Sequence, residues 1–444
     1  MLLQIEKMIY GGDGLARLPA DEHGRGKTAF VPFVLAGEKV EASITERKPG
    51  FVRAHADSIA EASPHRVQPG CPYFERCGGC HYQHATCEHQ LEIKRDILLE
   101  TLRRTAKLEL SIEIQTHPSP PWKYRNRSRL QVETKPVFKL GYFKMASHEL
   151  LAVEECPISS PLVNRGIARL WQIGREGKVP QGIRGIEFFV NAEDTEMQIT
   201  VSTTSEARRA ALQTWSEELL AAMPDIKGVV VFRESENKSK HSEEKLLTAG
   251  VDHLIYRTGK SDYKVSAGSF FQTNRHLTDE LVRIVTTGQS GELAVDLYAG
   301  VGLFSATLAG DFRHILSVES SQTSSADLAY NLPSNGRAVQ ATTEQYLTGT
   351  GKSGRFGKGA VLPNIGGRPD LAVVDPPRGG LGERVARSLA ILAAPRVVYV
   401  SCDPVTLARD LVVFLAGGYK IEQFHLVDLF PQTFHLESVV HLVR

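Results

Sequence analysis

Arg396-Val-Val-Tyr-Val-Ser-Cys-Asp-Pro404 is the stretch of this 444-residue chain that decides its fold. It opens with β-branched and aromatic residues, as expected of a buried parallel strand. Asp403 suits the N-cap of a helix, and Pro404 suits the first helical position, where a missing N–H costs nothing. Apolar residues then recur at helical spacing as far as Gly417-Gly418, a typical helix end. The stretch predicts a strand followed directly by a helix.

This arrangement gives Cys402 a reactive position. The residue lies at the carboxyl end of the predicted strand, just ahead of the helix N-terminus. Free N–H groups and the positive end of the helix dipole lower the pKa of a thiol there, so we predict a thiolate. The alternative is a buried cysteine that acts as a small apolar side chain. Open α/β sheets bind ligands outside the carboxyl ends of their strands, which favours the reactive interpretation.

Composition describes an ordinary globular protein, with 42% apolar and 23% charged residues and a net charge of +1. The length predicts about three domains. No apolar run reaches the roughly 18 residues of a membrane span, and no signal peptide is visible, so we expect a cytoplasmic protein. Disulfides are unfavourable there, which leaves the six cysteines as free thiols, metal ligands or catalysts.

Residues 1–60 are predicted to form an OB-like β-barrel. Short strand patterns alternate with Gly-rich turns there, and no helical period is present. Such barrels often bind single-stranded nucleic acid. This segment, however, carries eight Lys/Arg and eight Asp/Glu, so its composition alone indicates no nucleic-acid face.

Three cysteines lie within ten residues at the start of the next segment, 61–262, which we predict to be a central α+β domain. They are Cys71, Cys77 and Cys80, and Cys156 is the best candidate for a fourth ligand. Four thiolates suit either a 4Fe–4S cluster or a tetrahedral zinc site. The spacing does not decide between them. We favour the iron–sulfur cluster, partly because of the family resemblance described below.

A strip of cations and aromatic residues between Pro121 and Lys144 is the strongest nucleic-acid signal in the chain. Seven Lys/Arg accompany a single acid, Glu133, and five aromatic residues are interleaved with them. Cations contact phosphates and aromatic rings stack on bases, which predicts RNA binding. The alternative is a solvated amphipathic hairpin.

Residues 263–444 are predicted to form a Rossmann-like α/β domain. Asp296 ends a strand ahead of a turn containing Gly300 and Gly302, and Glu319 and Asp375 follow two further strands. No P-loop sequence is present. Because the pocket has acids and no phosphate cradle, it suits S-adenosylmethionine better than NAD.

The thiol at Cys402 indicates covalent chemistry on a pyrimidine. Addition of a thiolate to C6 makes C5 nucleophilic enough to attack a sulfonium methyl group. A base must then remove the C5 proton, and we choose Glu437 over His435 for that role, with Asp375 or nearby groups orienting the uracil edge. The alternative for Glu437 is a surface acid in a hairpin. Arg378 replaces the aromatic residue that amino-group methyltransferases carry after Pro-Pro, which argues against that chemistry.

Five motifs in this order resemble those of the RNA uracil-C5 methyltransferases. They are Gln272-Thr-Asn274, Asp296-Leu-Tyr-Ala-Gly-Val-Gly302, Asp375-Pro-Pro-Arg-Gly-Gly380, Ser401-Cys-Asp-Pro404 and His435-Leu-Glu437. The N-terminal pattern, with Phe30-Val-Pro and Leu35-Ala-Gly-Glu-Lys-Val, resembles a TRAM domain, an RNA-binding accessory. Together with the four cysteines, it resembles the iron–sulfur branch that methylates 23S rRNA.

The resemblance implies a role for each matching residue. Cys402 is then the nucleophile and Glu437 the base, and the cofactor contacts are Gln272, Tyr298, Glu319 and Asp375. It implies S-adenosylmethionine and a 4Fe–4S cluster as cofactors and RNA as partner, with no DNA, no membrane and a monomeric enzyme. Leu303 and Thr342 depart from the Asn that relatives often carry, and the insert Gly349–Gly367 receives no role. The alternatives are tRNA uracil-C5 or RNA cytosine-C5 methylation, and a redox-sensing RNA-binding protein.

Overall fold

The computed structural model describes residues 1–19, 26–234, 244–348 and 368–444. The insert Gly349–Gly367 and nearly all of the charged loop Glu234–Lys245 lie outside these ranges. The described chain divides into two compact units. The first comprises Met1–Leu110, Tyr142–Leu151 and Phe430–Leu436, and the second comprises Ser111–Gly141, Ala152–Leu429 and Glu437–Arg444. The three-domain division at residues 60 and 262 stays a prediction.

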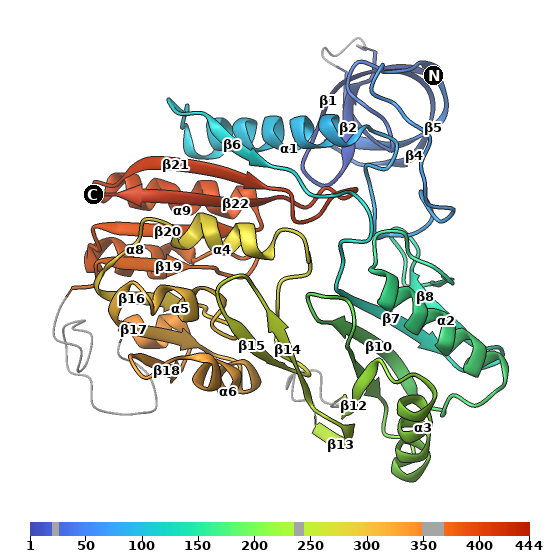
Figure 1. Ribbon diagram of the computed structural model, residues 1–444. Helices are drawn as coiled ribbons and strands as arrows, with labels where there is room; N and C mark the ends of the chain where they lie inside the picture. The colour runs from blue at the N-terminus through green and yellow to red at the C-terminus, as the bar shows by residue number, and fades with distance from the viewer. Residues whose placement is uncertain (20–25, 235–243, 349–367) are drawn as a thin grey trace. The chain divides into compact units, whose positions relative to one another are not determined.

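The first unit begins with the predicted barrel. Its five strands close in the order β1-β2-β3-β5-β4 (Figure 1). Alternate side chains such as Leu3, Ile5 and Val40 fill the interior, which explains why the segment shows a period of two. The strands are β1 (Leu2–Met8), β2 (Asp13–Arg17), β3 (Thr28–Pro32), β4 (Lys39–Arg47) and β5 (Phe51–Glu61).

A second core of the first unit forms around helix α1 (Cys87–Thr101). Thr86 caps the helix by accepting a hydrogen bond from the His89 N–H at 3.4 Å. Ile93 and Ile97 of α1 pack with other buried apolar residues, and Phe434 packs against them. Helical spacing of apolar residues predicts a helix from Glu88 through Lys107. In the structure, a π-helix (η1, Leu102–Ala106) follows α1 and ends at Lys107 in the left-handed region.

A seven-stranded sheet runs in the order β13-β12-β11-β10-β7-β8-β9, and helices α2 (Pro161–Arg175) and α3 (Arg209–Ala222) accompany it. Its strands are β7 (Arg127–Glu133), β8 (Lys139–Phe143), β9 (Leu150–Ala152), β10 (Ile183–Val190), β11 (Met197–Thr203), β12 (Ile226–Arg233) and β13 (Glu244–Gly250). A separate hairpin pairs β14 (His253–Arg257) with β15 (Asp262–Ser266). The elements confirm the mixed α and β character predicted for this segment.

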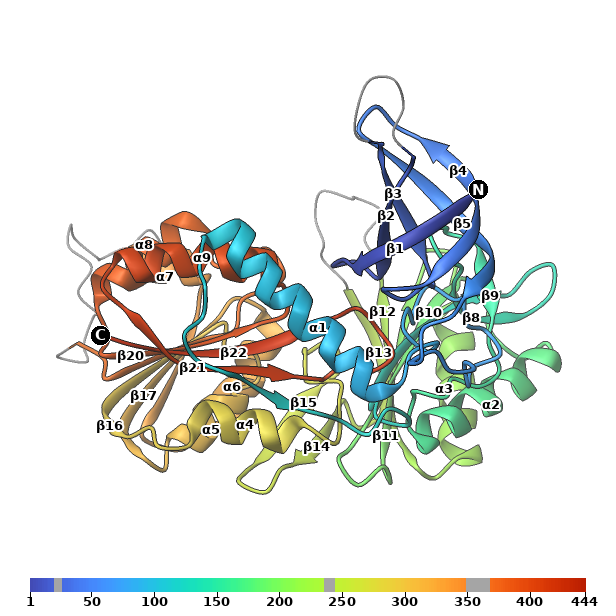
Figure 2. The same ribbon diagram turned by 90° about the horizontal axis from the view of Figure 1, so that it is seen from above.

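An eight-stranded sheet carries the predicted Rossmann-like fold, in the order β18-β17-β16-β19-β20-β22-β21-β6. The first five strands are parallel, and β22 is antiparallel to both β20 and β21. Figure 2 shows α8 and α9 on one face of the sheet, with α4 and α5 on the other.

The strands of this sheet are β6 (Ile114–His117), β16 (Gly291–Leu297), β17 (Phe312–Glu319), β18 (Gly336–Gln340), β19 (Leu371–Val374), β20 (Arg396–Ser401), β21 (Lys420–Val427) and β22 (Glu437–Val443). Its helices are α4 (Thr278–Thr286), α5 (Leu303–Leu308), α6 (Gln322–Asn331), α7 (Thr343–Thr348), α8 (Gly382–Leu392) and α9 (Pro404–Ala416). β20 and α9 are the strand and helix that the opening stretch predicts.

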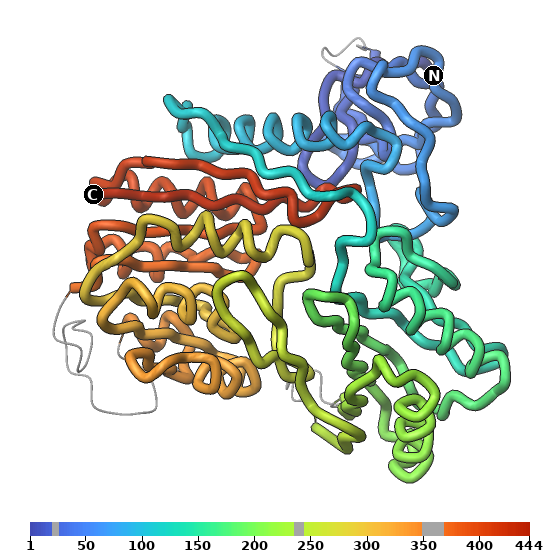
Figure 3. Tube along the Cα trace, viewed as in Figure 1, coloured from blue at the N-terminus to red at the C-terminus, as the bar shows by residue number. Residues whose placement is uncertain are grey.

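Strand β6 is an addition that the sequence did not reveal. It lies about 300 residues before its partner β21 and pairs with it in parallel, with Ile114 opposite Phe424 (Figure 3). Nε2 of His117 lies 3.0 Å from Nδ1 of His425, and Nδ1 of His117 lies 2.7 Å from a carboxylate oxygen of Glu280. Four residues are too few to show a strand period.

Within the described ranges, no helix combines the length and the apolar character needed to cross a bilayer.

Candidate active site

Four predicted functional side chains come together at one edge of the eight-stranded sheet. Asp296 lies next to the end of β16, and Asp375 and Cys402 directly follow β19 and β20. Glu437 begins the antiparallel strand β22, whose next residue, Ser438, pairs with Ser401. Because these strands are neighbours, their ends form a single site at the carboxyl edge of the parallel strands.

The structure confirms the helix start beside Cys402. The Asp403 carboxylate accepts hydrogen bonds from the Val405 N–H at 3.0 Å and from the Thr406 N–H at 2.9 Å, and Pro404 occupies the first turn. These two N–H groups are hydrogen-bonded to Asp403, so they are not available to stabilise a Cys402 thiolate.

The predicted low pKa of the Cys402 thiol is wrong. Burial, together with the nearby carboxylates of Glu437 and Asp375 and against a smaller lowering by Arg378, raises this pKa to about 12. Desolvation and like charge both disfavour a thiolate, and here they exceed the effect of the helix end. The free protein therefore holds Cys402 as a thiol.

The two carboxyl groups also hold their protons to higher pH than ordinary carboxyl groups do. Burial raises the pKa of Glu437 well above its ordinary value, and Asp375 adds to this shift while Arg378 opposes it. Burial and, to a smaller extent, the nearby Asp296 together raise the pKa of Asp375 to about 7. A carboxylate whose pKa is raised is a stronger base than an ordinary glutamate, which suits abstraction of a proton from carbon.

The ionisation of Asp375 predicts a pH-dependent stability. Because its pKa is raised on folding, the folded protein favours the protonated form, and stability is lost as the pH rises from about 4, where an aspartate of the unfolded chain ionises, to about 7. We expect Asp375→Asn to raise the Tm of the ligand-free protein by about 3 °C at pH 8 and by less than about 1 °C at pH 4. Thermal unfolding across this pH range tests it, and a gain of equal size at both pH values would contradict it.

A tight turn between β16 and α5 is shaped for close approach of a ligand. Tyr298, Gly300 and Gly302 all have positive φ, at +63°, +57° and +91°. A Cβ at Gly302 would lie 2.8 Å from Leu328, whereas one at Gly300 would meet nothing within 4 Å. A non-glycine residue held in this region, as Tyr298 is, often marks a functional site.

Acidic groups around this turn fit S-adenosylmethionine. Glu319 accepts hydrogen bonds from the Gly300 N–H at 3.0 Å and the Ser321 N–H at 2.6 Å. One oxygen of Asp296 accepts from the Ser305 hydroxyl, while its Oδ1 is buried without a hydrogen-bond partner. A buried, unpartnered carboxylate oxygen calls for a donor. The amino group and ribose hydroxyls of the cofactor are such donors.

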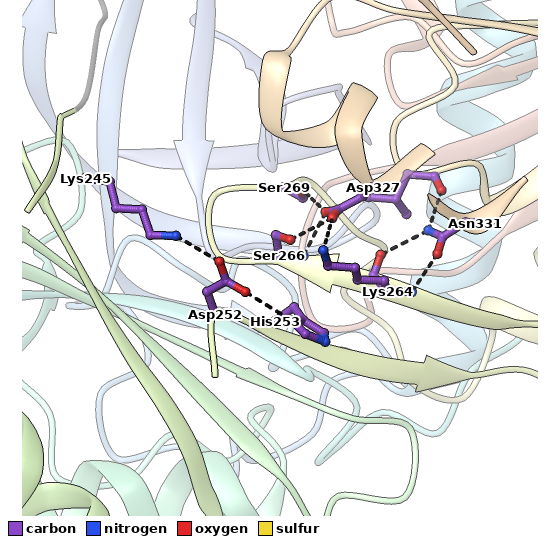
Figure 4. A network of polar contacts seen from close by, with 9 residues as sticks. Lys245, Asp252, His253, Lys264, Ser266, Ser269, Asp327 and Asn331 are labelled. Atoms are coloured by element: carbon purple, nitrogen blue, oxygen red, sulfur yellow. Dashed lines mark hydrogen bonds and ion pairs between the residues drawn. The ribbon is translucent and has the colours of Figure 1, made fainter. Parts of the chain in front are cut away.

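The loop that carries Gln272 is held to α6 by a polar network, shown in Figure 4. Asp327 accepts hydrogen bonds from the Ser266 N–H at 2.8 Å and from the hydroxyls of Ser266 and Ser269, both at 2.6 Å. Asn331 donates to the Val301 carbonyl at 2.8 Å, so α6 also holds the glycine turn. Gln272 itself is only 7% exposed.

This network predicts a specific effect on cofactor affinity. We expect Asp327→Asn to weaken binding of S-adenosylhomocysteine by roughly tenfold, because an amide group replaces one of the oxygens that hold the loop. The matched control is Asp252→Asn. Asp252 is drawn in the same view, but its ion pairs with Lys245 and His253 are exposed to solvent. Isothermal titration calorimetry measures both. Equal affinities for the two variants would rule out a positioning role for Asp327.

The Asp375-Pro-Pro-Arg-Gly-Gly380 loop is fastened to α9. The Thr406 hydroxyl donates to the Arg378 carbonyl at 3.1 Å, and Arg409 donates to the Gly379 carbonyl at 2.9 Å. Buried Asp410 accepts from the Leu381 N–H at 2.7 Å and from the Tyr399 hydroxyl at 2.8 Å. These supports could not be predicted from the sequence, because an Asp or Thr inside a helix gives no sign of which distant loop it holds.

The four predicted metal ligands do not form a metal site in the described structure. Cys71, Cys77 and Cys80 belong to the first unit and Cys156 to the second. Among the described residues, no group of three or more His, Cys, Asp or Glu side chains is placed to hold a metal ion. The described residues therefore give no support to the iron–sulfur prediction.

The cationic strip is less uniform than its sequence indicates. The guanidinium of Arg127 stacks on Phe189 at 4.3 Å and donates to the Ser269 carbonyl at 2.5 Å, so it supports the Gln272 loop. Lys139 pairs with Glu133 at 3.3 Å. RNA binding by the remaining cations of the strip stays a prediction.

A Rossmann-like sheet whose strand ends hold acids, a glycine turn and a cysteine fits an S-adenosylmethionine-dependent methyltransferase, and the family comparison shows this class. A family model described as tRNA (Uracil-5-)-methyltransferase matches residues 86–444, and a TRAM domain model matches residues 2–56. The chain belongs to this RNA uracil-5 methyltransferase family, and its barrel is a TRAM domain.

Relatives agree with this assignment. An uncharacterized RNA methyltransferase of Aquifex aeolicus is 32% identical over 99% of this chain and 97% of its own length. One of Listeria monocytogenes is 31% identical over 99% and 96%. The tRNA (uracil-54, C5)-methyltransferase of Pyrococcus abyssi, solved with S-adenosyl-L-homocysteine, has the same fold, with a TM-score of 0.75 and 24% identity over 99% of both chains.

Proposed function

We propose that the protein methylates C5 of a specific uridine in 23S rRNA through a transient bond between Cys402 and the uracil ring. The observation that supports this most directly is that Cys402, Asp375 and Glu437 lie at the same edge of the eight-stranded sheet. The glycine turn follows β16, the neighbour of β19 in that sheet. Family membership supports the uracil-5 chemistry.

The steps follow from the chemistry of these side chains. Deprotonated Cys402 attacks C6, and the electron pair of the C5–C6 double bond moves toward the O4 carbonyl to give an enolate, with Asp375 orienting the ring. Asp296, Glu319, Gln272 and Tyr298 would hold S-adenosylmethionine, which would supply the methyl group that C5 acquires and would leave as S-adenosylhomocysteine. Glu437 then accepts the C5 proton, the C5–C6 double bond re-forms, and the C6–S bond breaks to release the Cys402 thiolate.

Access to the ring requires the uridine to leave its base stack, since C6 is unreachable inside a helix. Phe270 supports binding of such an opened strand. It precedes Gln272 by two residues and is 62% exposed, although its loop is held by buried hydrogen bonds. An exposed aromatic ring on a rigid loop is suited to stack on an RNA base.

The choice of 23S rRNA rests on resemblance, through the TRAM domain and the four-cysteine pattern, and tRNA is the alternative. Mapping of 5-methyluridine and 5-methylcytosine in rRNA and tRNA of a deletion strain tests both. We expect loss of 5-methyluridine from 23S rRNA, restored by the wild-type gene and not by Cys402→Ala. Loss confined to tRNA would transfer the proposal to tRNA, and loss of 5-methylcytosine would overturn uracil chemistry.

A further inference from the structure

The segment Phe430–Leu436 is built into the first unit, although the residues on both sides of it, Leu429 and Glu437, belong to the second. We infer that this segment is a clamp held by Gln90 and Lys94 of α1, and that these two side chains are positioning residues for Glu437. The inference rests on the proposed role of Glu437 as the base.

Gln432 lies at the centre of the clamp. It is 2% exposed and adopts a φ of +69°, a conformation that a side chain disfavours and that surrounding contacts must hold. Its N–H donates to Oε1 of Gln90 at 2.8 Å, and its Oε1 accepts from Nε2 of Gln90 at 3.0 Å. Its carbonyl accepts from the N–H groups of His81 and Tyr82 at 2.8 and 3.0 Å.

Two further contacts fix the residues around Gln432. The ammonium of Lys94, a residue that is 1% exposed, donates to the Phe430 carbonyl at 2.9 Å. The ring of Phe434 packs edge-on against His81, with ring centres 4.6 Å apart, and against Tyr10 at 5.6 Å. The backbone is thus held at residues 430 and 432, and the side chain at 434.

Packing such a region with buried polar groups stabilises the fold less than apolar packing would. Gln90 and Lys94 lie on the helix that also supplies Ile93 and Ile97 to an apolar core, where further aliphatic residues would bury more apolar surface. Satisfied buried networks fix one geometry more sharply than apolar packing does. What this network fixes is the path of the chain into Glu437.

The clamp and the sheet act on opposite sides of Glu437. On its carboxyl side, Ser438 pairs with Ser401 and Leu426, next to the Cys402 nucleophile. On its amino side, only four residues separate Glu437 from Gln432. Loosening the clamp therefore frees the amino side of Glu437 and leaves the strand pairing beside Cys402 intact. The proton-abstraction step should suffer, while addition of Cys402 to uracil should not.

The test separates these two steps with ordinary uridine RNA. For Gln90→Leu and Lys94→Met in the full-length protein, we expect multiple turnover to fall roughly 10- to 100-fold, because the base is misplaced. Methyl transfer in the first turnover should stay within about twofold of wild type. The methylated covalent adduct should accumulate and be visible as a slowly migrating band on a denaturing gel.

Two controls make the result specific. Gln4→Leu removes an exposed glutamine of the same unit, whose side chain bonds the Gly37 carbonyl, and should behave as wild type. Gln90→Glu keeps the acceptor for the Gln432 N–H and loses the amide donor, so it should fall between wild type and Gln90→Leu. Gln90 also donates to the Ala85 carbonyl at 2.9 Å, and Lys94→Met decides the question if Gln90→Leu does not fold.

Glu437→Gln, measured in parallel, separates failure of the inference from failure of the proposed function. The positioning role is wrong, and the base assignment stands, if Glu437→Gln accumulates adduct and the clamp variants do not. The same conclusion holds if Glu437→Gln accumulates adduct but the clamp variants slow the first turnover as much as later turnovers. If Glu437→Gln accumulates none, the base assignment itself fails.

Discussion

Cys402→Ala is expected to lower methyl transfer by at least about 10⁴-fold, because no other group in the proposed scheme makes C5 nucleophilic. The same substitution should abolish the covalent complex with 5-fluorouridine RNA, in which fluorine replaces the proton that the base removes. Wild-type protein should form that complex in the presence of S-adenosylmethionine, as measured by denaturing electrophoresis and by mass spectrometry of the cross-linked peptide.

Cys87→Ala is the matched control for this experiment. Cys87 is an exposed cysteine at the start of α1, so it also lies at a helix N-terminus, and it has no role in the proposed scheme. It should retain wild-type activity and adduct formation. Full turnover by Cys402→Ala, or an adduct that persists in that variant, would show that the reaction does not use this sulfur.

The high pKa of Cys402 adds a condition to this mechanism. A thiol with a pKa of about 12 is almost entirely protonated at neutral pH, so the free protein is a poor nucleophile. The carboxyl groups of Asp375 and Glu437 contribute to that state, and they are also the groups that contact or act on substrates in the proposal. In the proposed scheme, a cationic cofactor bound near these acids would offset their effect on the thiol, which would link activation of Cys402 to a filled site.

Local sequence rules were sufficient for the framework of the site. The strand at 396–401, the Asp403 cap and Pro404 in the first turn depend on neighbouring residues only, and all three are confirmed. The barrel and the Rossmann-like sheet follow from the same kind of information, because alternation and turn chemistry are read within a few residues. Placement of the acids at strand ends followed once the strands were assigned.

Features that depend on distant parts of the chain were not predictable in this way. The thiol pKa was assigned the wrong sign because Asp375 and Glu437 come from strands 27 residues before and 35 residues after Cys402. Likewise, Gln90 and Gln432 are separated by 342 residues, and neither has a sequence pattern that names its partner. The role of Arg127 was hidden because a cation on a strand reads as solvent-facing until its neighbours are known.

Glu437→Gln is expected to trap the reaction after methyl transfer. The first turnover should proceed, because Cys402 and the cofactor site are unchanged, but the C5 proton should stay in place and the C6–S bond should not break. Multiple turnover should fall by roughly 10³-fold, and the methylated adduct should accumulate with ordinary uridine RNA. Quenched-flow measurement of methyl transfer, with gel analysis of the adduct, gives both quantities.

The pH dependence of the same step identifies the base. Glu437 must be ionised to accept a proton, and burial and Asp375 raise its pKa. The rate of adduct breakdown in the wild type should therefore increase with pH, and the increase should occur at pH values well above the ordinary pKa of a glutamate. In Glu437→Gln this rise should disappear, whereas Glu422→Gln, which changes an exposed glutamate on β21, should retain it. Adduct breakdown in Glu437→Gln at the wild-type rate, with the wild-type pH profile, would assign the proton to another group, because an amide side chain has no ionisation that reproduces such a profile.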